Sequence, residues 1–426
     1  MSDFFRIDKI IVEGYGPFKS NIFTFPKKKN QEKAEIHLFT GQNGSGKSTI
    51  LSIIAALVDE LNQQKVRKDC SNYIEIHLSP KVDKLPLGHS AEFRNAITTE
   101  LMMYTAFQPL MRYKSKVKSA SETEYDFAMF AYSGSRQINA DKIRGIEELT
   151  SNPLHNALSF DNSTNPNELV QWVANMKTKE ALALARSDNE KATKYKESIS
   201  RIEKAISKVI NKSIEFVLED DPLNVVIKYE GIHLDFGLLP DGLKSIISWM
   251  SDLLMRMDRL KWKDDLDPFK SSFILLLDEI DVHLHPEWQR QILPIVQSLF
   301  VNAQLFITTH SPFVVGSCDD VWIHNLKLEN HIIEPILSED SKSYETILKE
   351  IFGINERFVQ EVEDKLKVFR ILRDKMFKDK YISEQYNEEL LALIKYFDNQ
   401  DSIEIQSIIG AEIKQLERLL NVSVRG

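Results

Sequence analysis

The nine residues GQNGSGKST, from Gly41 to Thr49, constrain the fold of this chain more than any other segment. They follow EIHLFT (35–40), whose apolar run predicts a buried strand, and they precede ILSIIAALV, which predicts a helix. Between a strand and a helix, the pattern GxxxxGK[ST] forms a loop whose backbone N–H groups surround phosphate groups. A glycine-rich turn that merely caps a helix is the alternative, and the two flanking elements disfavour it.

The residues of this loop have distinct expected tasks. Its glycines allow the close backbone approach and unusual dihedral angles that a phosphate cradle needs. The Lys47 ammonium would reach the β- and γ-phosphates of a nucleotide, and the Ser48 hydroxyl would bind Mg²⁺. The predicted nucleotide-binding residues of the loop are Gly41, Asn43, Gly44, Ser45, Gly46, Lys47, Ser48 and Thr49.

A second segment, FILLLDE, ends in two adjacent carboxylates, Asp278 and Glu279. Its apolar run predicts a buried strand, and ligands of open α/β sheets bind at the C-terminal edge of such strands. There Asp278 would support the Mg²⁺ ion, and Glu279 would act as the general base that activates water. A solvated acidic strand end is common by itself, but the phosphate-loop pattern in the same chain favours the functional interpretation.

Two further candidates follow downstream, Asp281 in EIDVHLHPEWQ and His310 at the end of LFITTHS. A histidine that ends a strand beside the Asp278 strand could hydrogen-bond the γ-phosphate and so sense its presence. A core histidine satisfied by a neighbour is the alternative. His283 and His285 have no further metal ligands nearby in the sequence, so we expect a structural role for them and no catalytic metal beyond Mg²⁺.

The composition, with 42% apolar and 27% charged residues, is typical of a folded globular protein. The formal net charge of −9 excludes a chain that binds nucleic acid through its bulk charge. Contact with DNA would therefore need a partner or a local basic patch. The candidates are Lys27–Lys29 and the run Arg112, Lys114, Lys116 and Lys118, with solvated surface as the alternative interpretation.

The chain has two cysteines, Cys70 and Cys318, which lie far apart in the sequence. They predict neither a disulfide framework nor a zinc ribbon, and they favour a reducing compartment. No apolar run reaches the roughly 18 residues that a membrane-spanning helix needs, and the N-terminus lacks the pattern of a signal peptide. We therefore expect a cytoplasmic protein without a membrane domain.

The alternation of strand and helix patterns predicts an α/β fold. SFILLLDE (272–279), a helix over 286–300 and AQLFITTHS (303–311) form a β–α–β unit, which implies parallel strands. A polar run over 168–212 carries isoleucines at spacings of three and four, which predicts an amphipathic helix in a small lobe. Beyond residue 338 the sequence is charged and helix-rich.

We therefore predict three parts for the chain. The nucleotide-binding domain spans 1–337 and contains an inserted helical lobe over about 60–235. The helical C-terminal region spans 338–426. This region could bind a partner, act as a lid, or simply pack against the domain.

In their order, GQNGSGKST, LLLDE, IDVHLHP and ITTHSP resemble the motifs of ABC-type P-loop ATPases of the SMC, RecF and OLD kind, from Ile7 to about Val315. The resemblance implies an ABC ATPase head that binds ATP and Mg²⁺. It also implies a head-to-tail dimer, in which each ATP lies between the Walker A loop of one subunit and the signature motif of the other.

Three further assignments follow from this resemblance. The signature motif corresponds to LPDG, which ends at Gly242, although a β-turn into a helix would explain the same residues. Pro240 replaces the usual serine, so either Ser245 or the backbone supplies the missing contact, or the contact is weaker. Asp281 matches the D-loop position.

The glutamine that senses Mg²⁺ in this family is assigned to Gln137, with Gln108 as the alternative. Arg136, beside Gln137, could contact phosphate or form a surface ion pair.

Two features restrict which members of this ATPase group the chain can resemble. About 230 residues separate Thr49 from Asp278, too few for long coiled-coil arms. The DxD pattern that an OLD-type nuclease domain needs occurs only at Asp265 and Asp267, where we expect a loop.

The stretches LLPDGLKSIISWMSDLLMR and LLLDEIDVHLHPEWQRQILP resemble the ATPase subunits of Septu anti-phage systems, also found beside retrons. This narrower resemblance implies an oligomeric ATPase that binds and regulates a separate HNH-type nuclease. DNA would then be reached through the complex. Two alternatives stay open: a RecF-like repair ATPase that binds DNA directly, and a nucleotide-regulated scaffold with incidental turnover.

Overall fold

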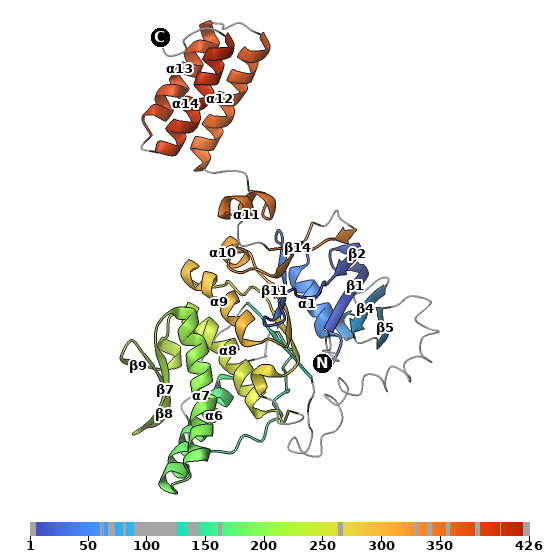
Figure 1. Cartoon of the computed structure of the whole chain (residues 1–426), viewed down its shortest axis with the longest axis vertical. Helices are drawn as coiled ribbons and strands as arrows, with labels where there is room; N and C mark the ends of the chain where they lie inside the picture. Colours follow the sequence, from blue (N-terminus) through green and yellow to red (C-terminus); the bar gives the residue numbers. More distant parts are fainter. Residues whose placement is uncertain are drawn as a thin grey trace. The chain divides into compact units, whose positions relative to one another are not determined.

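The structure, a computed structural model, describes residues 6–59, 62, 64–66, 73–79, 82–88, 125, 127–134, 143, 145–160, 164–262, 267–327, 331–338, 343–354, 358–379, 384–400 and 402–420. The chain divides into two compact units, Met1–Phe352 and Gly353–Gly426. The two structural units thus divide after Phe352. The functional boundary that the sequence analysis placed after residue 337 stays a prediction. Figure 1 labels the elements along the chain.

The first unit contains most of these elements. Its strands are β1 (Arg6–Tyr15), β2 (Phe18–Thr24), β3 (Glu35–Thr40), β4 (Tyr73–Ser79), β5 (Val82–Gly88), β6 (Ala128–Tyr132), β7 (Ile214–Asp220), β8 (Leu223–Tyr229), β9 (Ile232–Leu234), β10 (Phe273–Leu277), β11 (Ala303–Thr308), β12 (Val321–Asn325), β13 (Ile332–Ile333) and β14 (Ile336–Leu337). Its helices are α1 (Lys47–Ala55), α6 (Pro166–Ala185), α7 (Asn189–Ile210), α8 (Asp241–Arg259), α9 (Pro286–Leu299), α10 (Pro312–Val315) and α11 (Tyr344–Glu350).

A central sheet with the strand order β14-β12-β3-β11-β10-β6 carries the site. Its strands from β12 to β6 are parallel, and β14 pairs antiparallel with β12. The predicted β–α–β unit is present as β10, α9 and β11. The α/β fold class predicted from the sequence is thereby confirmed.

Side chains of the central strands alternate between two cores. In β10, Phe273, Leu275 and Leu277 face one core, whereas Ile274 and Leu276 face the other. A strand that is buried on both faces reads as a continuous apolar run, which is why FILLL gives a clear sequence signal. Both faces of the sheet are therefore covered, so a ligand could reach the sheet only at its edges.

One face of the central sheet packs against α1 and the antiparallel sheet β13-β2-β1-β4-β5. Within this core Phe39 and Phe306 from the central sheet lie against Phe25, with ring centroids 6.3 and 5.0 Å away. For β5, the structure describes only the backbone and its antiparallel pairing with β4. The β1–β2 hairpin of this layer reaches the phosphate loop at its turn.

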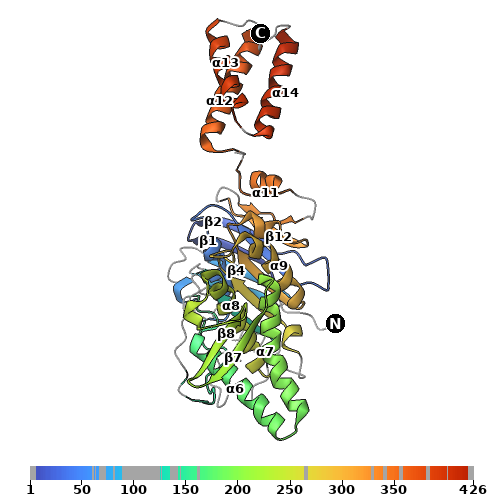
Figure 2. The ribbon, with the colours of Figure 1, turned by 90° about the vertical axis from the view of Figure 1, so that its left-hand side faces the viewer.

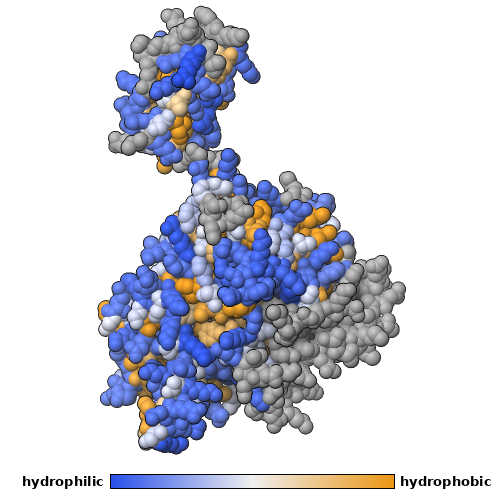
Figure 3. Space-filling view, viewed as in Figure 1, coloured by the Kyte–Doolittle hydropathy of each residue, from blue (hydrophilic) through white to orange (hydrophobic). Residues whose placement is uncertain are grey.

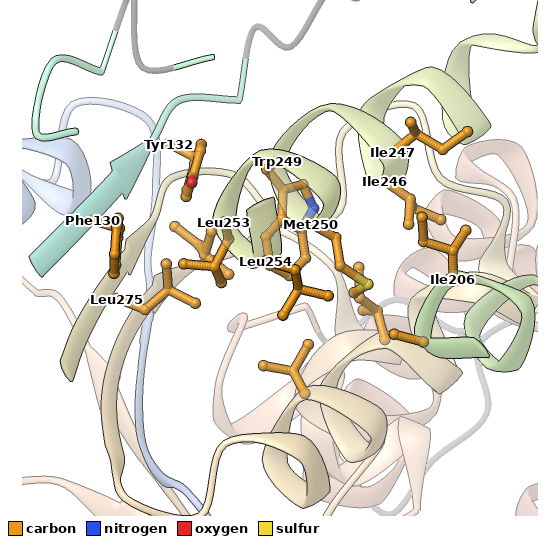
Figure 4. Packing of buried hydrophobic residues seen from close by; sticks show 14 of the residues in the cluster. Phe130, Tyr132, Ile206, Ile246, Ile247, Trp249, Met250, Leu253, Leu254 and Leu275 are labelled. Atoms are coloured by element: carbon orange, nitrogen blue, oxygen red, sulfur yellow. The ribbon is translucent and has the colours of Figure 1, made fainter. Parts of the chain in front are cut away.

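Helix α8 covers the opposite face and is almost entirely buried from Gly242 to Met257. Figure 4 shows Leu253 lying toward Phe130 and Leu275 of the sheet, while Ile246 lies toward Ile206 of α7. Because one helix contacts the sheet and the inserted elements, the central core continues into the inserted lobe without a break.

The inserted lobe consists of the hairpin α6–α7 and the sheet β7-β8-β9. Figure 1 and Figure 2 both show α6 and α7 side by side, with β7 and β8 next to them. The helical run predicted over 168–212 is present but consists of two helices, because Ser187 adopts a left-handed φ of 58° and Asp188 caps α7 through the Lys191 N–H. The lobe is also not purely helical, because it contains the strands β7–β9, which the sequence analysis did not predict.

The second unit is a three-helix arrangement of α12 (Gln360–Asp379), α13 (Glu384–Asp398) and α14 (Ile403–Leu420). Its own apolar core includes Phe369, Phe397 and Ile409, each fully buried. On its surface Arg373 Nη1 donates to Glu412 Oε2 at 2.6 Å. This unit therefore has a core that is independent of the first.

Within the described residues, no helix is long and apolar enough to cross a membrane. Blue hydrophilic side chains predominate on the face of the first unit shown in Figure 3, with apolar residues scattered among them.

A buried polar network joins the antiparallel sheet to the central sheet at the start of β3. Glu35 Oε1 accepts hydrogen bonds from Arg6 Nη2 and Gln304 Nε2, both at 2.7 Å, and lies 3.1 Å from His37 Nε2. Burial by itself opposes ionisation of Glu35, but His37 and the Arg6 guanidinium outweigh it and hold the pKa of Glu35 at about 2. Burial also lowers the pKa of His37 and of His324 beside it.

This network predicts the acid sensitivity of the first unit. A carboxylate whose pKa falls on folding stabilises the fold above its unfolded pKa of about 4.3, and the contribution disappears as the pH falls toward 2. We expect Glu35→Gln to lower the free energy of unfolding by about 3 kcal/mol at pH 7, and the difference from wild type to shrink below about pH 4.

Denaturant unfolding followed by tryptophan fluorescence measures this effect, because all five tryptophans lie in the first unit. Glu32→Gln is the matched control, since Glu32 is exposed three residues away. Equal stability of the two variants would contradict the assignment.

Candidate nucleotide-binding site

The phosphate loop connects the end of β3 to the start of α1. Gly41, Gly44 and Gly46 adopt φ angles of 144°, 78° and 97°, which side chains rarely tolerate. A Cβ on Gly46 would lie 2.3 Å from Phe18 Cζ, so the loop rests against the β1–β2 hairpin. A Cβ on Gly44 would meet nothing within 4 Å, so this part of the loop lies open.

Lys47 begins α1 and is 7% exposed. Its Nζ donates to the carbonyl oxygens of Gly41 and Gln42, each at 3.0 Å, which brings the ammonium across the loop. Burial lowers the pKa of Lys47, and the charges of Asp278 and Glu279 act in the opposite direction. The loop lysine and the acidic end of β10 therefore share one electrostatic environment.

The acidic end of β10 is held by Thr308 at the end of β11. The buried Thr308 hydroxyl donates to Asp278 Oδ1 at 2.5 Å and accepts from the Glu279 N–H at 2.7 Å. Glu279 itself adopts a left-handed φ of 46°. Thr308 was not among the predicted residues, although a polar side chain at the end of an apolar strand was a usable signal.

Asp281 accepts two hydrogen bonds from residues of the same chain. Its Oδ1 accepts hydrogen bonds from the Thr309 hydroxyl and, at 3.3 Å, from the His310 N–H. His310 lies two residues after the end of β11 and is exposed. The predicted D-loop aspartate thus lies against the backbone of the predicted phosphate sensor.

The predicted signature glycine, Gly242, lies buried in the first turn of α8. A Cβ on Gly242 would lie 2.6 Å from the His283 carbonyl oxygen, so packing within the subunit already requires a glycine here. Ser245 is 1% exposed, and its hydroxyl has no hydrogen-bond partner among the described residues. It therefore does not reach a second subunit to replace the serine missing at Pro240, and two alternatives stay open: a contact through the backbone, or a weaker contact.

A cavity of about 590 Å³ adjoins the site on the side of Ser48 and Asp278. Polar side chains, including His155 and Asn156, form much of its lining. The turn that carries them is anchored by Arg256, whose Nη1 donates to the His155 carbonyl at 2.9 Å. The sequence analysis did not identify this wall of the site.

Several predicted residues fall outside the part of the chain that the structure describes. These are Gln108, Arg112, Lys114, Lys116, Lys118, Arg136, Gln137 and Asp265.

Other candidates have structural roles. His285 caps α9 by accepting from the Glu287 N–H at 3.3 Å, and the described residues contain no cluster of three metal-ligating side chains. In the Lys27–Lys29 run, the Lys28 ammonium donates to the carbonyls of Lys33 and Val301, both at 2.6 Å. Asp267 pairs with Arg201 at 3.1 Å.

The residues present fit a polyphosphate with a divalent cation. The first N–H groups of α1 have no acceptor within the helix, and the buried Ser45 hydroxyl has no partner among the described residues. Ser48 is exposed beside the same cavity that Asp278 lines, as two oxygen ligands of one cation would be. The fold and this loop define the chain as an α/β protein of the P-loop nucleotide-binding class.

Comparison with known proteins agrees with this class. A family model described as "AAA domain, putative AbiEii toxin, Type IV TA system" matches residues 129–316, and one described as "AAA domain" matches residues 5–85. The chain is 26% identical to the Retron Ec83 probable ATPase of Escherichia coli over 64% of this chain and 49% of the relative. It is 23% identical to the Septu protein PtuA of Bacillus thuringiensis over 87% of this chain and 85% of the relative.

Among solved structures, an SMC head bound to the C-winged helix domain of ScpA aligns with a TM-score of 0.42 and 14% identity, over 78% of this chain and 97% of that one. The chain spans about half the length of the Retron Ec83 ATPase. The resemblance to retron and Septu ATPases predicted from the sequence is confirmed, and it supports ATPase activity at the level of these relatives.

The glycines of the loop generate a stability prediction. Gly44→Ala and Gly46→Ala both impose a left-handed backbone on alanine, which costs about 1–2 kcal/mol. Only Gly46→Ala adds a clash with Phe18. We expect Gly46→Ala to lower the melting temperature of the nucleotide-free protein clearly more than Gly44→Ala does. Equal melting temperatures would contradict the packing described for the loop.

Proposed function

We propose that this chain is a Mg²⁺-dependent ATPase of an anti-phage defence complex, which binds ATP between head-to-tail subunits and regulates a separate HNH-type nuclease. One observation carries the proposal: adjacent parallel strands bring the phosphate loop, the acidic pair and His310 to the same sheet edge. The similarity to retron and Septu proteins supports the defence setting.

In this proposal the loop binds the phosphates, with Lys47 contacting the β- and γ-phosphates. Ser48 and Asp278 hold Mg²⁺, which neutralises charge on the phosphate oxygens when bound. Glu279 accepts a proton from water as the water oxygen bonds to the γ-phosphorus and the bond to the ADP oxygen breaks. His310 donates a hydrogen bond to the γ-phosphate.

The remaining assignments concern the second subunit and the cation. The N-terminal turn of α8 at Gly242 would face the γ-phosphate of a partner subunit, through its backbone, and Asp281 would lie at the subunit contact. Gln137 would contact the hydrated Mg²⁺. Because each site is completed by a second subunit, hydrolysis should be slow in the monomer.

Two variants separate nucleotide binding from hydrolysis. Lys47→Ala removes the loop cation and should weaken ATP binding, measured by titration with a fluorescent ATP analogue, by at least about 10-fold. Glu279→Gln should bind ATP normally and hydrolyse it at least about 100-fold more slowly, because a general base contributes that much. Glu287→Gln is the matched control for a carboxylate that is exposed nearby. Hydrolysis by Glu279→Gln at the wild-type rate would exclude Glu279 as the base.

A second experiment tests the nuclease. The chain is purified alone and with a small HNH protein encoded beside it, and DNA cleavage is followed during an ATP titration. We expect cleavage that needs the partner and changes with ATP in the wild type but not in Lys47→Ala. Cleavage by the single chain, or DNA-stimulated hydrolysis without a partner, would favour a repair-type enzyme. Unchanged phage protection by Glu279→Gln would favour a nucleotide-regulated scaffold.

A further inference from the structure

Glu279 lies between two neighbouring strands that contact opposite sides of it. In the register of the parallel sheet, Leu277 pairs with Tyr132 of β6 on one side and with Ile307 of β11 on the other. Two residues further along the β6 chain, Gly134 therefore lies opposite Glu279. Thr308, the residue after Ile307, contacts Glu279 from the β11 side.

Gly134 is buried and leaves room for the Glu279 side chain. A Cβ on Gly134 would lie 2.6 Å from Glu279 Oε2 and 2.8 Å from Glu279 Cβ. The contact with Glu279 Cβ matters more than the contact with Glu279 Oε2, because a side-chain rotation of Glu279 cannot move its Cβ away. The φ of Gly134 lies outside the left-handed region, so its backbone tolerates a side chain. The contact with Glu279 is thus the reason that the structure gives for a glycine here.

Thr308 holds the other end of the same residue. Its hydroxyl accepts from the Glu279 N–H at 2.7 Å and donates its single proton to Asp278 Oδ1 at 2.5 Å. Thr308 is fully buried, so water does not compete for either bond. The hydroxyl thereby keeps Glu279 at its left-handed φ of 46°, a conformation that a non-glycine residue adopts at some cost.

We propose that Gly134 and Thr308 are positioning residues for the proposed reaction: together they aim the Glu279 carboxylate, one by leaving space and the other by holding the backbone. The inference rests on the proposed role of Glu279 as general base. A displacement of about 1 Å in such a group can cost about 100-fold in rate, which makes a purely steric contact relevant to catalysis.

Gly134→Ala is the first test. We expect kcat for ATP hydrolysis to fall about 10- to 100-fold while ATP affinity stays within about 3-fold, because the loop is untouched. Gly145→Ala is the matched control, since a Cβ at Gly145 would meet nothing within 4 Å, and it should keep the wild-type rate. Wild-type kcat in Gly134→Ala would overturn the role of Gly134.

A double-mutant cycle tests the contact without nucleotide. Gly134→Ala should lower the melting temperature in the wild-type background. Glu279→Gly removes the clashing atoms and suits the left-handed backbone, so Gly134→Ala should have little further effect in that background. Additive losses in melting temperature would show that Gly134 acts independently of Glu279, and this would overturn the proposal.

Thr308→Val and Thr308→Ser test the hydroxyl. Valine keeps the shape but cannot bond Glu279 or Asp278, so kcat should fall about 10-fold or more with ATP affinity little changed, and serine should restore it. Equal rates in both variants would assign Thr308 a packing role only. If Glu279→Gln hydrolyses ATP like wild type while the melting cycle shows coupling, the proposed function fails and the contact stands.

Discussion

The pairing of β11 with β3 on one side and with β10 on the other is the constraint on which the site depends. Parallel strands end at the same edge of a sheet, so the loop after β3 and the acids after β10 meet there. This edge places Lys47 in the field of Asp278, Glu279 and Asp281. These carboxylates, together with the carbonyl oxygens of Gly41 and Gln42, offset the cost of burying the ammonium.

The same edge also links residues with different proposed tasks. Thr308 bonds the side chain of Asp278 and the backbone of Glu279, while Asp281 accepts from Thr309 and from the His310 backbone. Hydrogen bonds from the end of β11 therefore hold the turn that follows β10 in place. A displacement of either strand end would disturb Asp278, the proposed cation ligand, and Glu279, the proposed base, together.

Helix α8 extends this arrangement into the inserted lobe. Its N-terminal turn packs at Gly242 against the His283 carbonyl, and near its other end Arg256 pairs with Asp252 at 2.6 Å and holds the turn at His155. Asp252 also accepts from the Tyr132 hydroxyl at 2.9 Å. Arg256 Nη1 thus joins α8 to the wall of the cavity through the carbonyls of Pro153 and His155, and the partner Asp252 balances its buried charge.

The phosphate loop, the acidic strand end and the α/β class could be predicted from the sequence, because each depends on a short run of residues with its own local periodicity. The break at Ser187 was missed, since a helical pattern does not reveal where a left-handed residue interrupts it. The sheet β7–β9 was not predicted either. By contrast, the positions of Gly134 and Thr308 on either side of Glu279, and the burial of Ser245, are visible only in the folded chain. Those outcomes depend on strand register and helix packing between segments far apart in the chain, and no local pattern encodes such pairings.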